Sequence, residues 1–354
     1  MEKRTNKNVK GITLIALVLT IIVMLILVGI TINLTLGEDG IIKRAQEAGQ
    51  TYKNAEANEI ADITSFEASV IPGKVAKTVD GVQYVGDGMG NLIPVPVGFS
   101  YLEGTKSTGF VIKNDTDGNE FVWVPCTLDG DNGSIKYDRY AFLTGYVEEI
   151  DEETNFKKIK YSNEDEEYWI EELQEDEKKC VAQYEGYYIG RYEAANEENS
   201  KLVVQKNKNV YHSILYADAK NKAESLYNKQ ENNVISKLCS GYAWDTALKF
   251  IETKYPEYPT NSVGGNYGND KITDGNYNVK TGLDKVHPCN IYDMGGNVNE
   301  WTTEKYIGNA NNFTLSRRGG DRSDKADVGP AASRLTPTGE HVYGYTGFRV
   351  CLFL

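Results

Sequence analysis

The chain has few of the residues that build common catalytic and metal centres. It contains three histidines, His212, His287 and His341, which are far apart in the sequence and argue against a histidine-based metal site. No two of its five cysteines are spaced as Cys-x-x-Cys, which argues against a zinc knuckle or a dithiol redox motif. The sequence also lacks Gly-x-Ser-x-Gly, a phosphate-binding loop and His-Glu-x-x-His.

Positive charge is also scarce. Lysine and arginine number 38 against 51 aspartates and glutamates, which gives a net charge of −13. Nucleic-acid-binding proteins need cations clustered on one face, so we expect no nucleic-acid partner. Hydrophobic residues make up 40% of the chain and charged residues 25%, proportions typical of a folded globular protein.

Residues 12–36 contain no charged side chain, and their length suits a helix that crosses a bilayer. Four lysines and arginines precede this segment, against one acid. The positive-inside rule therefore keeps residues 1–11 in the cytoplasm and places the C-terminal domain outside the cell. We expect a single-pass membrane protein that contacts the membrane through residues 12–36.

The sequence Lys-Gly-Ile-Thr-Leu-Ile at 10–15 resembles the processing site of type IV prepilins, which are cut after the glycine. The resemblance implies a leader at 1–11, with Gly11 and Ile12 as the processing residues and with pilin subunits as possible partners in a pilus. That family usually has glutamate at the fifth mature position, where this chain has Ala16. An uncleaved signal anchor is the alternative.

Beyond the membrane segment, apolar residues at helical spacing predict an amphipathic helix over 37–70, which Pro72-Gly73 ends. Residues 71–89 indicate a linker with short strands, and we place the main domain at 90–354. Within it, an acidic insert at 148–179 predicts a solvated helix or a flexible loop. Residues 121–125 predict a buried strand, and residues 233–255 predict a helix.

Four motifs lie near the C-terminus. Residues 290–301 read Asn-Ile-Tyr-Asp-Met-Gly-Gly-Asn-Val-Asn-Glu-Trp, and they precede Arg-Arg-Gly-Gly at 317–320, Ala-Ala-Ser-Arg at 331–334 and Gly-Phe-Arg-Val at 347–350. Their order and spacing resemble the formylglycine-generating-enzyme/sulfatase-modifying-factor family. The resemblance implies an α+β, C-type-lectin-like domain with much irregular loop, here preceded by a long pilin-like helix. The arginines of these motifs are expected in scaffold contacts.

The resemblance also implies a structural calcium ion. Its ligands would be the carboxylates of Asp293 and Glu300 and the carbonyls of Gly296 and Val298, since calcium prefers oxygen. The alternative is a tight turn whose polar side chains only satisfy backbone groups.

Members of the family that oxidise cysteine hold copper with two cysteines between the Gly-Gly and Ala-Ala-x-Arg motifs. Here that stretch, 321–330, contains no cysteine. Cys351 lies beyond it, where we expect a small apolar residue in the final strand. We therefore expect no copper, and a formylglycine-generating-type oxidoreductase is kept as an alternative.

The same C-terminal stretch resembles the variable proteins of diversity-generating retroelements, in which loop residues on a rigid scaffold contact a ligand. The resemblance implies a cell-surface, membrane-anchored or pilus-associated protein whose non-catalytic domain binds an extracellular protein or glycan. Ordinary loop composition and a structural minor pilin are the alternatives. The expected contact residues are Asp321, Ser323, Asp324, Asp327, Thr338, His341, Tyr343 and Tyr345.

Overall fold

The computed structural model describes residues 14–37, 40–152, 155–161, 168–170, 172–197, 201–268, 279–307, 313–335 and 344–354. They divide into two compact units, Met1–Thr64 and Ser65–Leu354. The predicted processing residues Gly11 and Ile12 lie outside the described residues. Thr338, His341 and Tyr343, three of the expected contact residues, lie outside them as well.

The first unit is helical. Helix α1 (Leu14–Leu36) has no buried residue, and among the described residues it supplies the one segment long and apolar enough to cross a membrane. The hydroxyls of Thr20, Thr31 and Thr35 each donate to the carbonyl four residues earlier, at 2.7 Å. The hydroxyl groups of these side chains are therefore satisfied within the helix. Helix α2 (Ile41–Ser69) follows and occupies most of the predicted amphipathic stretch.

The second unit starts with the last residues of α2 and continues into a small antiparallel sheet of three strands. Residues 71–89, the expected linker, contain two of these strands, and Val82 and Val85 are buried in the same core cluster as Trp123. These residues therefore pack as part of the second unit. The strands are β1 (Val75–Val79), β2 (Val82–Gly86) and β3 (Leu92–Pro96).

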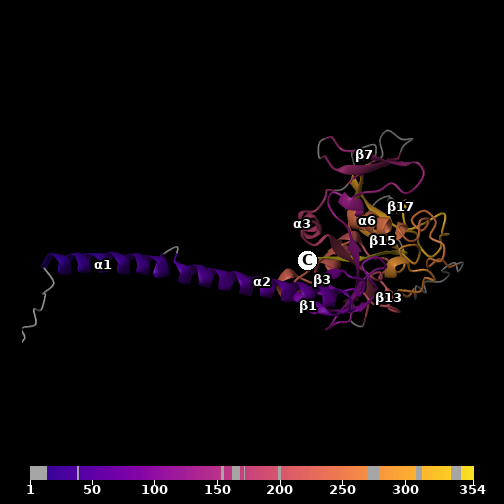
Figure 1. The fold of residues 1–354 in the computed structure, drawn as a ribbon. Helices are drawn as coiled ribbons and strands as arrows, with labels where there is room; N and C mark the ends of the chain where they lie inside the picture. Colours follow the sequence, from indigo (N-terminus) through magenta and orange to yellow (C-terminus); the bar gives the residue numbers. More distant parts are fainter. Residues whose placement is uncertain are drawn as a thin grey trace, which may run out of the picture. The chain divides into compact units, whose positions relative to one another are not determined.

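A six-stranded antiparallel sheet forms the centre of the second unit (Figure 1). Most of its β-branched and aromatic residues are buried, as in the Phe-Val-Trp-Val run at 121–124, so the strand predicted there is confirmed. Helix α3 (Glu175–Tyr184) packs on β10 and β19, and helix α6 (Gly241–Glu252) packs on β6. In sheet order the strands are β14 (Ile235–Leu238), β19 (Val350–Phe353), β10 (Gly186–Gly190), β6 (Glu120–Pro125), β5 (Val111–Asn114) and β4 (Phe99–Glu103).

A second large sheet is centred on β15 (Asn299–Ile307), which also pairs in parallel with β18 (Thr346–Phe348). The remaining strands of this sheet are β17 (Arg334–Leu335), β16 (Phe313–Arg318), β9 (Tyr168–Ile170), β8 (Lys157–Tyr161) and β7 (Tyr146–Ile150).

The acidic insert is where the sequence interpretation was wrong. Instead of only helix or loop, it contains β7, β8 and β9, and Figure 1 shows the β7 end of this sheet away from β1 and β13. Lysines face acids across the hairpin: Lys157 lies 3.1 Å from Glu148, and Lys158 lies 3.3 Å from Asp151. Opposite charges on facing strands stabilise the pairing, so acidic composition alone was misleading.

The predicted helix at 233–255 is shorter in the structure. Residues 235–238 form β14, and α6 begins only after Ser240, whose hydroxyl accepts the Ala243 N–H at 3.1 Å as an N-cap. The smaller elements are β11 (Ala195–Asn196), β12 (Leu202–Val203), β13 (Asn209–Val210), α4 (Tyr216–Glu224), α5 (Lys229–Asn232), η1 (Asp131–Gly133) and η3 (Pro288–Asn290). The chain is thus α+β, a long N-terminal helix followed by a sheet-rich domain.

Candidate functional site

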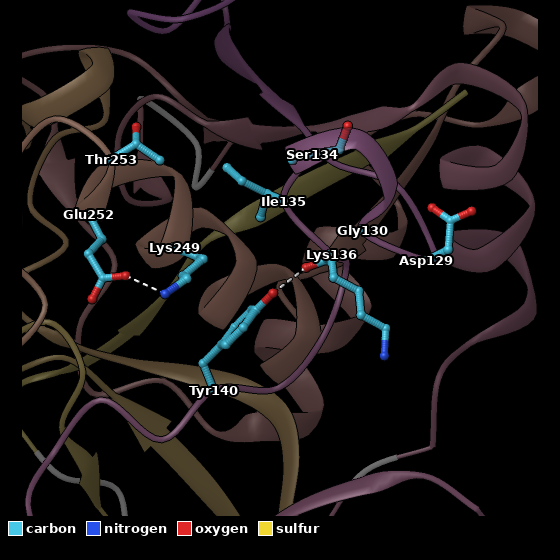
Figure 2. Close-up of a pocket in the computed structure, with 10 residues that line it drawn as sticks. Asp129, Gly130, Ser134, Ile135, Lys136, Tyr140, Lys249, Glu252 and Thr253 are labelled. Atoms are coloured by element: carbon cyan, nitrogen blue, oxygen red, sulfur yellow. Dashed lines mark hydrogen bonds and ion pairs between the residues drawn. The ribbon is translucent and has the colours of Figure 1, made fainter.

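The best-defined cavities lined by described residues lie away from the predicted site. One of them, of about 470 Å³, is bordered by the loop at 129–136 and by the end of α6 (Figure 2). There Lys249 pairs with Glu252 at 2.5 Å, and the Tyr140 hydroxyl donates to the Lys136 carbonyl at 2.7 Å. These cavities are lined by residues other than 290–300 and 321–335.

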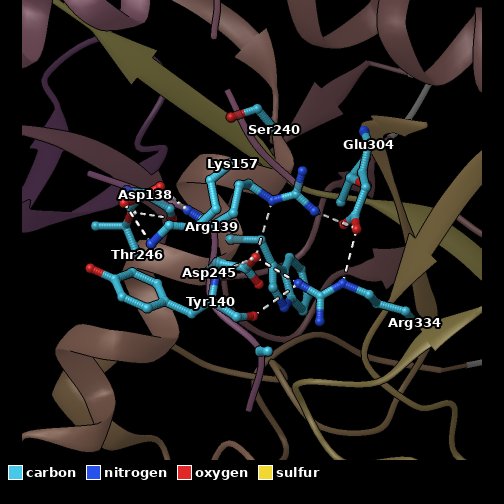
Figure 3. Close-up of polar contacts among 12 residues, drawn as sticks. Asp138, Arg139, Tyr140, Lys157, Ser240, Asp245, Thr246, Glu304 and Arg334 are labelled. Atoms are coloured by element: carbon cyan, nitrogen blue, oxygen red, sulfur yellow. Dashed lines mark hydrogen bonds and ion pairs between the residues drawn. The ribbon is translucent and has the colours of Figure 1, made fainter. Parts of the chain in front are cut away.

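Two of the motif arginines belong to a fully buried ionic network, which we call the arginine network (Figure 3). Asp245 of α6 lies 2.7 Å from Arg318 and 2.6 Å from Arg334. Glu304 of β15 lies 2.9 Å from each of the same arginines. Arg139 joins both acids, at 3.2 Å from Asp245 and 2.5 Å from Glu304. The expected scaffold role of Arg318 and Arg334 is confirmed.

This network holds three guanidiniums against two carboxylates, and every side chain in it is 0% exposed. Burial alone would raise the pKa of Glu304, but Arg139, Arg334 and Arg318 outweigh it and hold that pKa well below its ordinary value. Arg318 also donates to the Ser333 carbonyl at 3.2 Å. The network therefore ties the Arg-Arg-Gly-Gly and Ala-Ala-Ser-Arg motifs to α6 and β15.

The loop predicted to bind calcium has an unusual backbone. Cys289, Asn290, Asp293 and Asn297, none of them glycine, have φ of 53°, 61°, 55° and 62°. Such left-handed conformations cost free energy and persist only where surrounding contacts fix them. Here the Asn297 N–H donates to the Asn266 carbonyl at 2.9 Å.

The predicted calcium carboxylates are both bound by protein donors. Glu300 accepts three hydrogen bonds from Arg349, at 2.7 to 3.2 Å, which confirms the expected scaffold role of that arginine. Asp293 accepts from the Asn266 amide at 3.1 Å and from the Gly282 N–H.

Two further acids, which the sequence interpretation missed, lie beside them. Glu193 accepts from the Asn297 amide and, at 3.2 Å, from the Val298 N–H. Asp284 accepts the Asp293 N–H at 3.1 Å. We call the set of four acids with Arg349 the carboxylate cluster: Glu193, Asp284, Asp293, Glu300 and Arg349.

The carboxylate cluster carries more negative than positive charge. Burial, reinforced by Asp293 and Glu300, raises the pKa of Glu193 well above its ordinary value. Burial and then Asp293 raise the pKa of Asp284 to about 8. Three buried oxygens nearby have no hydrogen-bond partner within the described structure: Asp284 Oδ1, Asn297 Oδ1 and Asn299 Oδ1.

Charge and geometry give different answers about calcium. Surplus buried negative charge and unpaired oxygens suit a hard divalent cation. Within the described residues, however, no three carboxylates, thiols or imidazoles are arranged to hold a metal ion. The Gly296 and Val298 carbonyls lie in the same loop, but calcium binding by Asp293, Gly296, Val298 and Glu300 stays a prediction.

The expected ligand contacts at 321–327 form a turn beside this loop. Asp321 accepts from the Ser323 N–H at 2.8 Å, and its own N–H donates to Asp324 Oδ2 at 3.0 Å. Asn299 links two expected contact residues, because its amide donates to Asp321 at 3.1 Å and its N–H donates to the Tyr345 carbonyl at 2.8 Å. Ser323 and Asp327 are exposed, whereas Asp321, Asp324 and Tyr345 are half-buried.

The five cysteines are free and at most 5% exposed. Cys351 lies in β19 and is fully buried, which confirms its predicted place in the final strand. The Cys239 thiol donates to the Ser240 carbonyl at 3.6 Å. Burial raises the pKa of Cys180 and of Cys289 to about 12, so these thiols stay protonated at neutral pH.

Comparison with known proteins gives no family assignment. No family model matches the chain, and no curated protein matches it. Among solved structures it is similar to PvdO from Pseudomonas aeruginosa, with 16% identity over 71% of this chain and 100% of that chain and a TM-score of 0.35. It is also similar to CarF, with 20% identity over 35% of this chain and 49% of that chain and a TM-score of 0.26.

A third solved structure is the Major Tropism Determinant P3c variant, with 10% identity over 80% of this chain and 96% of that chain and a TM-score of 0.20. All three TM-scores are below 0.5, so these similarities do not assign the fold family. The family resemblance therefore continues to depend on the sequence motifs.

Proposed function

We propose that this protein is tethered to the membrane by α1 and binds an extracellular protein or glycan through the turn at 321–327. The tether is supported by the apolar, entirely unburied surface of α1 and by the positive charges that precede it. The domain has the family scaffold but uses it for binding rather than for oxidation.

The proposal depends on the backbone hydrogen bonds that connect the turn at 321–327 to neighbouring loops. The Arg322 N–H donates to the Asn297 carbonyl at 3.0 Å, and the Ser262 N–H donates to the Ala326 carbonyl at 3.0 Å. Its outer residues Ser323 and Asp327 remain exposed, and Val328 is 69% exposed. A fixed backbone that presents exposed side chains loses little conformational entropy on binding.

Topology is tested by treating intact cells that produce the full chain with an external protease. We expect the second unit to be digested while residues before α1 are protected. Protection of the second unit in intact cells, with digestion only after lysis, would place it inside and contradict the proposal.

Binding is tested on cells that display the full chain, with arrays of extracellular proteins and glycans as probes. We expect Ser323→Arg with Asp327→Arg to reduce binding at least about tenfold, since central contacts contribute about 1.4 kcal/mol or more. The matched control is Lys178→Glu with Lys179→Glu on α3, which also changes two exposed side chains. Equal binding by both double variants would exclude the turn as the contact surface.

The two alternatives have direct tests. A structural minor pilin is favoured by the continuous exposure of α1 and most of α2, and N-terminal sequencing of membrane-extracted protein that begins at Ile12 would support prepilin processing. An oxidoreductase would show copper-dependent thiol oxidation that is lost on replacing Cys239 or Cys351. We expect no such turnover, because both thiols are 0% exposed.

A further inference from the structure

A small polar cavity lies where α3, α4, β14 and β15 meet, separate from the residues discussed above. Its volume is about 140 Å³. Each water molecule takes up roughly 30 Å³, so the cavity has room for about five water molecules. A ligand of about five non-hydrogen atoms would fill it.

Glu177, in the first turn of α3, lines this cavity and is 1% exposed. One carboxylate oxygen, Oε2, accepts the Tyr137 hydroxyl at 2.5 Å and the Ser240 hydroxyl at 2.9 Å. Tyr137 and Ser240 do not line the cavity. The other oxygen, Oε1, accepts no hydrogen bond from any described residue, so we infer that it faces the cavity.

Glu177 also has no ion-pair partner within the described structure. Lys237 acts on Glu177 through its charge, but its ammonium group pairs with Asp176 at 2.9 Å. Burial raises the pKa of Glu177 even though the two hydroxyls and Lys237 favour its charged form. A hydrogen bond from an N–H donor stabilises a buried carboxylate more than an exposed one, because water competes less for the carboxylate oxygen. This applies to a buried carboxylate that has one oxygen without a hydrogen-bond partner.

The lining as a whole carries three cations and three anions. The cations are Lys220, Lys237 and Lys305, and the anions are Glu172, Glu224 and Glu177. The Glu177 carboxylate would repel a simple anion, and the three ammonium groups would repel a simple cation. A molecule with both charges can satisfy both sets.

We propose that this cavity binds a small zwitterion of the α-amino-acid class, with its ammonium group on Glu177 Oε1 and its carboxylate toward the lysines of the rim. The geometry favours the smallest members, since the space available excludes long side chains. This site is independent of the proposed surface for extracellular ligands.

The test is calorimetric titration of the full chain in detergent micelles with glycine. Acetate and methylammonium, each carrying one of the two charges, are titrated separately. We expect glycine to bind at least ten times more tightly than either. Acetate or methylammonium binding as tightly as glycine, or no heat from glycine at any concentration, would overturn the proposal.

Variants locate the site. Glu177→Gln keeps the shape of the side chain and should weaken glycine binding at least tenfold. Lys178→Gln, on the adjacent exposed position of α3, should leave binding unchanged. If Glu177→Gln does not fold, Lys220→Gln at the rim serves instead and should weaken glycine binding at least threefold. Unchanged affinity in a folded Glu177→Gln, or in Lys220→Gln where it serves instead, would show that glycine binds elsewhere.

Discussion

The arginine network and the carboxylate cluster are both buried, but they balance charge in opposite ways. The network places two carboxylates among three guanidiniums, and the pKa of Glu304 falls. The cluster places four carboxylates around one guanidinium, and the pKa of Glu193 rises. Both belong to the scaffold that carries the C-terminal motifs.

The difference shows which of the two buried groups has its charges compensated by protein side chains alone. A buried ion pair is tolerated when its partners satisfy each other, and losing one partner is costly because the other charge stays buried. The network meets this condition with protein groups alone. The cluster does not, so protons or a cation must compensate its surplus charge. The following predictions test that contrast on the full chain in detergent micelles, from the largest expected effect to the smallest.

The largest effect is expected from Glu304→Gln. It leaves three buried guanidiniums with one carboxylate, so the free energy of unfolding should fall by about 3–5 kcal/mol. Chemical denaturation would measure the loss. The matched control, Glu252→Gln in the partly exposed pair with Lys249, should change stability by less than about 1 kcal/mol. Equal losses in the two variants would mean that the network is not the dominant ionic element.

Calcium should stabilise the protein through the carboxylate cluster. A cation that binds only the folded state at a hundred times its Kd raises the free energy of unfolding by about 2.7 kcal/mol. We expect a higher unfolding temperature in calcium, measured by thermal denaturation with magnesium as the comparison. If calcium does not change the unfolding temperature, then bound protons rather than calcium compensate the surplus negative charge of the carboxylate cluster.

Acid should weaken the arginine network. The pKa of Glu304 is lower in the folded state than in the unfolded chain, so its contribution is present above the ordinary pKa and is lost as pH falls below it. Below about pH 4.5 the unfolding free energy should fall with a slope approaching 1.4 kcal/mol per pH unit for this one proton. Denaturation at several pH values should show a shallower slope in Glu304→Gln. If the slope is the same in Glu304→Gln, the loss of stability in acid comes from other carboxylates.

The smallest effect is expected from Glu193→Gln in calcium-free solution, within about 1 kcal/mol of the parent. The substitution removes surplus charge, and the amide of residue 193 can donate to Asn297 Oδ1, which has no partner in the described structure. Its carbonyl can still accept the Val298 N–H. A loss as large as that of Glu304→Gln would show that the cluster needs every carboxylate charged.

The sequence predicted those features that depend on short patterns. The apolar run at 12–36 predicted α1, and the apolar residues at 121–125 predicted the buried strand β6. The motif arginines indicated ion pairs because a guanidinium in a scaffold motif needs an acceptor.

The partners of those arginines could not be read from the sequence. Arg139 lies 165 positions from Glu304 and sits in no recognised motif, so only the folded chain shows the contact. Glu193 lies outside the four C-terminal motifs, so no sequence pattern identified it. The hairpin within the acidic insert was missed because its stability comes from lysine–acid pairs across strands, which net composition conceals.

Strand β19 is inserted between β14 and β10, and the N–H of Leu354 donates to the Cys180 sulfur at 3.2 Å. During synthesis, the central sheet therefore stays open along that line until residues 350–353 have left the ribosome. Closure of the central sheet therefore depends on a strand that is distant in sequence from both of the strands it joins.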